Sequence, residues 1–152
     1  MTVLQALKKI KHLSRKLEKN RARMQKWCSH LETEETMYDW EKLMQSCQDL
    51  VTEIAKLRHS LHLTNISETV DFDGRTYTID ELIGMRTTVI PNRIVLWKSL
   101  RRREKGYHDP KEAKVVTHFD FKKRDMEVDK LEDLLDDVDA ILDHVNITTK
   151  II

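Results

Sequence analysis

The chain has 152 residues with 27 Lys or Arg and 26 Asp or Glu, so its formal net charge is +1. A balance this close to neutrality argues against nucleic acid as a partner, because phosphate contacts need a surplus of cations. Charged residues make up 35% of the chain, which has 3 Gly and 2 Pro, a composition typical of long helices. The length fits one domain over residues 1–152, and the modest apolar fraction favours a homo-oligomer.

No stretch is apolar enough to span a bilayer, and the first residues lack the continuous hydrophobic core of a secretory signal. Cys28 and Cys47 stand alone, without the close spacing of a metal or redox motif. Isolated thiols suit a reducing compartment. We therefore expect a cytoplasmic protein with no membrane partner.

Two long helices are predicted first, because apolar residues recur at intervals of three and four along this part of the chain. The first helix is expected from about residue 3 to 31, and the second from about 37 to 61. The polar segment 32–36 is the expected bend. Folding the two helices together predicts an antiparallel coiled-coil hairpin over residues 1–63.

A small β-ribbon is predicted over residues 69–78, because Asp73 and Gly74 supply the positive φ angles of a type I′ turn. Residues 115–121 alternate apolar and polar side chains, which predicts a short strand able to pair with the ribbon.

Two further helices are predicted, over residues 79–105 and 121–146. Thr78 and Glu81 have the spacing of a capping box at the start of the first of them. Pro91 lies within its periodic pattern and should kink this helix rather than end it. The predicted fold class is therefore mainly α: a bundle of about four helices built on the long hairpin, with a small β-ribbon insert.

The first and last helices carry opposite charge. From Lys8 to Lys26 there are nine basic residues against Glu18, whereas Asp120 to Asp143 holds ten carboxylates and four basic residues. Long helices of opposite charge usually pack together, within a chain or between subunits. We favour this pairing over contact of the basic helix with nucleic acid.

Two arginines interrupt the apolar stripe of the predicted helix 79–105. Arg86 and Arg93 fall where the 3.6-residue period places core side chains. A guanidinium on a buried face needs a carboxylate partner or an anionic ligand, since an unpaired buried charge costs several kcal/mol. Asp133, Asp136 or Asp137 on the last helix would satisfy the first alternative, and the second alternative predicts a ligand pocket.

The ligand alternative gathers polar side chains around the predicted kink. Arginine donates bidentate hydrogen bonds to phosphate or carboxylate, and a kink frees backbone groups beside it. The candidate ligand-binding residues are Thr64, Asn65, Arg75, Arg86, Thr87, Asn92, Arg93, Lys114 and His118.

No catalytic motif is present: the chain has no Gly-rich phosphate loop, no nucleophile elbow and no HExxH. We therefore expect no enzyme activity and no cofactor. His59 and His62 lie one helical turn apart, but no third ligand is evident, so no metal site is predicted.

Three segments together resemble a known family. They are the run Leu63-Thr64-Asn65-Ile66, the run from Asp73-Gly74 to Met85-Arg86, and the late Leu142-Asp-His-Val-Asn146-Ile-Thr. In this order they are similar to the small, largely uncharacterised bacterial and phage proteins called septicolysin-like. The resemblance spans nearly the whole chain and implies a helical, oligomeric protein.

Three functions stay open on the sequence. The first is a non-enzymatic oligomer that sequesters a small anionic ligand such as a nucleotide, and the second is a coiled-coil interaction or scaffold protein. The third, implied by the family label, is a membrane-active cytolysin, which would need hidden apolar surface.

Overall fold

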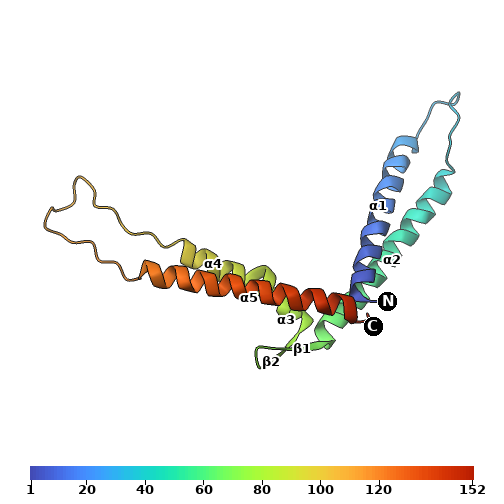
Figure 1. Ribbon diagram of the computed structural model, residues 1–152. Coiled ribbons are helices and arrows are strands. Elements are labelled where there is room, and N and C mark those ends of the chain that lie inside the picture. The colour runs from blue at the N-terminus through green and yellow to red at the C-terminus, as the bar shows by residue number, and fades with distance from the viewer. The chain divides into compact units, whose positions relative to one another are not determined.

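The computed structural model describes residues 1–152 (Figure 1). It is mainly helical with one small antiparallel sheet, which confirms the predicted fold class. The elements in chain order are α1 Val3–Trp27, α2 Trp40–Ser67, β1 Thr69–Phe72, β2 Arg75–Thr78, α3 Ile79–Gly84, the π-helical turn η1 Met85–Val89, α4 Ile90–Lys98 and α5 Phe121–Thr148. None of the helices combines the length and the apolar composition that a bilayer crossing requires.

The chain divides into two compact units, which are described separately. The first unit holds Met1–Ile79 with His144–Ile152, and the second holds Asp80–Asp143. The sequence predicts one folding domain, and that statement stays a prediction.

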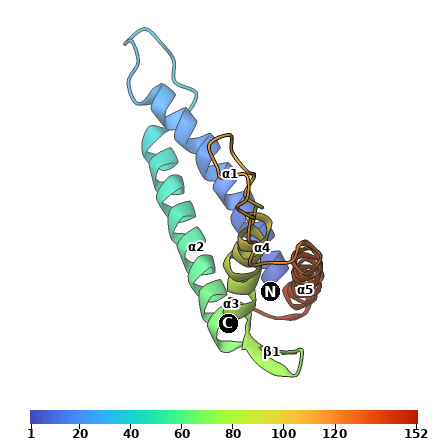
Figure 2. The same ribbon diagram turned by 90° about the vertical axis from the view of Figure 1, so that its left-hand side faces the viewer.

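The first unit is built on the predicted hairpin of α1 and α2, which lie side by side (Figure 2). A capping box begins α1, because the Thr2 hydroxyl accepts the Gln5 N–H while the Gln5 side chain accepts the Thr2 N–H. Two apolar clusters join the helices. They are Val3, Ala6 and Leu61 with Ile10 and Ile151, and Leu13, Leu50 and Ile54 with Ile10, Leu17 and Leu57.

The boundaries of both hairpin helices differ from the prediction. The first stops at Trp27 rather than at residue 31, and the second begins at Trp40 after an irregular connection. Leu31, which was expected to extend the apolar stripe, is exposed. A helix turn that buries nothing gains little from tertiary packing, so the first helix ends there.

The ribbon of β1 and β2 has the predicted turn. Asp73 and Gly74 have φ angles of 51° and 73°, and Phe72 pairs with Arg75 across them. The predicted third strand at residues 115–121 is wrong: the sheet has two strands, and this segment is irregular up to the start of α5. None of residues 115–121 is buried, so the alternating pattern has no buried face to stabilise a strand.

The second unit packs α3, η1 and α4 alongside α5 (Figure 1). Pro91 distorts the helix without ending it, as predicted. The distortion is a π turn in which the Ile90 N–H donates to the Met85 carbonyl, five residues back. The wider turn accommodates a proline that cannot donate a backbone hydrogen bond. The buried side chains of this unit are Leu82, Ile90, Val128, Val138 and Leu142.

The helix predicted to reach residue 105 ends at Lys98, whereas α5 agrees with the prediction to within two residues. Residues 99–120 form an irregular connection between the two helices. Its first part contains Arg101, Arg102 and Arg103, three exposed like charges with no apolar side chain among them. Nothing there favours another buried helical turn.

Candidate functional site

Thr64 is the most buried of the predicted ligand-binding residues, but its hydroxyl is already in use. The side chain is 0% exposed, and its Oγ1 donates to the Ser60 carbonyl at 2.9 Å. The same oxygen accepts the Ile152 N–H at 3.0 Å. This hydroxyl therefore fastens the end of the chain to α2, and its neighbour Asn65 is half-buried beside it.

The remaining predicted residue of the first unit, Arg75, is exposed on β2. Its guanidinium lies over the Tyr77 ring, 5.6 Å from the ring centroid. A cation–π contact at an exposed site is weak and leaves the donors of the guanidinium available to water.

Arg86 has a carboxylate partner on the last helix, though not one of the three that the sequence suggested. Its Nη1 lies 3.6 Å from Oδ1 of Asp139, and the two side chains are 39% and 48% exposed. The separation exceeds a good charge-assisted hydrogen bond, so the pair is loose. Neither group is buried, which removes the premise that this charge needs compensation inside a core.

The neighbouring candidate residues Thr87, Asn92 and Arg93 do not form a ligand pocket. Thr87 donates its hydroxyl to the Ile83 carbonyl at 2.8 Å, as helical threonines commonly do. Asn92 and Arg93 are exposed, and no hydrogen bond or ion pair holds their side chains. The prediction that Arg93 lies on a buried face is therefore wrong.

Lys114 and His118 are exposed in the irregular segment 99–120. This segment joins the end of α4 to the start of α5, and both of these helix ends lie far from α3 and η1 (Figure 1). Lys114 and His118 are therefore separated from Arg86 and Arg93 within their own unit.

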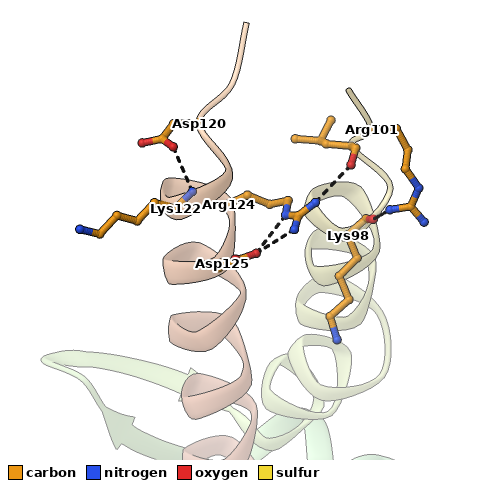
Figure 3. Close-up of polar contacts among 7 residues, drawn as sticks. Lys98, Arg101, Asp120, Lys122, Arg124 and Asp125 are labelled. Carbon is orange, nitrogen blue, oxygen red and sulfur yellow. Dashed lines mark hydrogen bonds and ion pairs between the residues drawn. The ribbon is translucent and has the colours of Figure 1, made fainter. Parts of the chain in front are cut away.

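The polar contacts at this end of α4 and α5 form a clamp around Arg124 that the sequence did not suggest (Figure 3). Its Nε and Nη2 each lie 3.0 Å from Oδ1 of Asp125, and its Nη1 donates to the Leu100 carbonyl at 3.4 Å. About two turns further along α5, the Lys98 ammonium pairs with Glu132 at 2.9 Å. The start of α5 is thus fastened to the end of α4.

A shallow depression of about 440 Å³ adjoins the clamp. It is lined by Lys98, Arg101, Arg124, Asp125, Val128 and Asp129. Since Lys98 and Arg124 already hold carboxylates, the depression offers little net positive charge to an anion. We therefore assign Lys98 and Arg124 to holding the two helices together.

Comparison with known protein families gives a match over most of the chain. Residues 10–151 match the profile of a family of unknown function, DUF6847. The chain belongs to this family. No curated protein and no solved structure matches it.

Membership of DUF6847 corrects the resemblance drawn from the sequence. The match covers nearly the whole chain and concerns another family, so the septicolysin-like assignment is wrong. Its segments, such as Thr64-Asn65 and Asp73-Gly74, have structural roles in this DUF6847 protein: a fastened helix end and a hairpin turn. The cytolysin function was implied by that label alone, so it has lost the resemblance that supported it.

The charged helices are the other polar feature of this DUF6847 chain. Of the nine basic residues from Lys8 to Lys26, Lys9 has an ion pair, with Glu53 at 2.6 Å. On α5, four carboxylates have ion-pair partners, namely Asp125, Glu127, Glu132 and Asp139. The other cations of α1 and the other carboxylates of α5 have no ion pair, so most of this charge is uncompensated by direct contact.

Proposed function

We propose that the protein is a non-enzymatic binding protein that acts as an oligomer of its own chain and serves as a helical interaction scaffold. The exposed area carries this proposal. By the size scaling of monomers, two separate compact proteins with the masses of the two units would together expose about 9,700 Å². The chain exposes 11829 Å². The chain thus exposes more surface than two compact proteins of these sizes, and a second copy would cover part of it.

The exposed apolar side chains support the same proposal. Leu7 and Val51 lie on the α1–α2 hairpin, and Val95 and Met126 lie on α4 and α5. Single exposed apolar residues are ordinary, but several along the same helices are typical of helices that acquire further neighbours on assembly. The cytoplasm remains the proposed compartment, since both cysteines are free thiols.

Sedimentation velocity over a micromolar concentration series tests this function. We expect one discrete species whose mass is a multiple of 18.1 kDa and which persists on dilution. A mass of 18.1 kDa at every concentration would remove the oligomer and with it this proposal.

A second candidate function is binding of a small anionic ligand at η1. The observation that favours it is the loose pairing of Arg86 with Asp139 at 3.6 Å beside a π turn, since such turns are frequent at functional sites. A phosphate that accepts two hydrogen bonds from the guanidinium would replace this weak partner.

Substituting Arg86→Ala tests the second candidate. The folded protein should lose less than about 1 kcal/mol, because exposed ion pairs contribute little. Calorimetric titration with inorganic phosphate and with ATP should then show binding to the parent protein and at least about tenfold weaker binding to the variant, one charge-assisted contact being worth that much. Equal affinities, or no heat from the parent protein, would eliminate this site. Arg101→Ala is the matched control.

A further inference from the structure

We propose that the acidic face of α5 is the docking site for the basic face of α1 in a second copy of the chain. This inference rests on the proposed function and specifies the surface through which the copies associate. The basic face consists of Lys8, Lys11, Arg15, Lys19 and Lys26. The acidic face consists of Asp129, Asp133, Asp136, Asp137 and Asp143.

The basic face is a continuous stripe along α1. Its residues follow at intervals of three, four, four and seven, so they share one side of the helix. All five are exposed, and none has an ion pair. The opposite side of α1 is the one that packs on α2 through Val3, Ala6 and Leu13. The hairpin therefore leaves this stripe outside its core.

The acidic face has the same character on α5. Four of its residues, Asp129, Asp133, Asp136 and Asp143, are separated by four, three and seven positions, and Asp137 lies beside them. All five are exposed and have no ion pair. Carboxylates repeated along one side of a helix repel one another, so cations that approach this face stabilise it.

The two faces have the same number of charges and similar lengths. Each has five charges, and at 1.5 Å per residue the basic face spans about 27 Å and the acidic face about 21 Å. Apolar side chains flank both faces: Leu7 on α1 is 45% exposed, and Met126 on α5 is 51% exposed. Contact would bury such flanking residues together with the charged pairs, as the polar rims and apolar cores of interfaces do.

Charge complementarity identifies a second copy as the occupant. Nucleic acid would cover the basic face but would be repelled by the carboxylates of the same chain, whose net charge is +1. Another copy supplies both signs in equal number, so it compensates both faces at once. Such complementary charges also fix which surfaces meet, because like-charged pairings are disfavoured.

Charge exchange between the faces is the decisive experiment. One variant reverses the basic face with Lys11→Glu, Arg15→Glu and Lys19→Glu, and the other reverses the acidic face with Asp129→Lys, Asp133→Lys and Asp136→Lys. We expect each variant alone to associate at least about 100-fold more weakly, because like charges then oppose each other. An equimolar mixture of the two should recover the assembly, measured by native mass spectrometry as mixed species.

Recovery in the mixture separates pairing between copies from pairing within one chain, since only the former joins two different variants. A control variant reverses three exposed cations outside both faces, Lys56→Glu, Arg58→Glu and Arg102→Glu, and should assemble normally. Circular dichroism verifies that each variant is folded. If a reversal unfolds the chain, neutral glutamine at the same three positions of α1 should still weaken association, but by less, because attraction is lost and no repulsion is added.

Other outcomes overturn the inference. Assembly that is unchanged in both variants would place the interface elsewhere and leave the proposed oligomer intact, whereas a monomeric parent protein would refute the proposed function itself. Weakened variants that do not recover on mixing would assign the pairing to a single chain. Loss of nucleic-acid retention in the α1 variant, with assembly unchanged, would assign the basic face to nucleic acid.

Discussion

Leu82→Ala should lower the free energy of unfolding by about 2–5 kcal/mol, the range for removing a fully buried leucine side chain. Leu82 is 0% exposed and lies in the short helix α3, where few other side chains are fully buried. The truncation removes favourable transfer free energy and leaves a cavity that a two-helix layer cannot readily close. Urea unfolding followed by circular dichroism measures the change.

Leu96→Ala is the matched control for this prediction. The same substitution is made in α4, but Leu96 is 67% exposed and lies outside both charged faces. Its substitution should change the unfolding free energy by less than about 0.5 kcal/mol, as surface substitutions usually do. Comparable losses of unfolding free energy in the two variants would show that the burial of Leu82 does not stabilise the second unit.

Thr64→Val should release the last residues of the chain and lower stability by about 1–3 kcal/mol, the cost of leaving a polar partner unsatisfied. Valine has nearly the shape of threonine, so no cavity forms at this 0%-exposed position. What is lost is the hydroxyl that accepts the Ile152 N–H and donates to Ser60. Hydrogen exchange should show faster exchange at the Ile152 amide.

Thr52→Val controls for the hydroxyl itself. Thr52 also lies in α2 and donates its hydroxyl to the carbonyl four residues back, at 3.0 Å, but it is exposed and holds no terminal residue. Protection of the Ile152 amide should be unaffected by this variant. If Thr64→Val leaves that protection unchanged as well, the contact does not fasten the chain end.

The long helices and the ribbon could be predicted because their signals are local and extended. Apolar periodicity over more than twenty residues located the ends of α1 and α5 to within four residues and those of α2 to within six, and Asp73-Gly74 located the turn through its backbone requirement. The strand predicted at 115–121 failed for the opposite reason. A strand depends on a partner elsewhere in the chain, and seven alternating residues do not show whether one exists.

The candidate site was predicted less well because its contacts depend on register between distant segments. The sequence placed a carboxylate of the last helix opposite Arg86, but only the packed helices show that it is Asp139. The role of Thr64 depends on Ile152, which lies 88 positions away, and no local pattern indicates it. Arg93 was expected on a buried face because the apolar stripe was assumed to be covered throughout, whereas much of α4 is exposed.

The opposite charges of α1 and α5 were evident from the sequence, and the structure adds which of them are exposed and unpaired. This distinction turns a general electrostatic complementarity into two defined faces. A pairing made largely of exposed charges should weaken steeply with added salt, since ions screen such contacts. It also gives the assembly a specified orientation, which a purely apolar surface would not.

Cross-linking with a carbodiimide, applied to an equimolar mixture of protein carrying natural nitrogen and protein labelled with ¹⁵N, tests the pairing of α1 with α5 most directly. The reagent joins lysines to carboxylates without a spacer. We predict cross-links between Lys8, Lys11 or Lys19 and Asp129, Asp133 or Asp136, detected by mass spectrometry with one light and one heavy peptide in the same product. Products in which both peptides always carry the same label, or no products between these helices, would contradict the account.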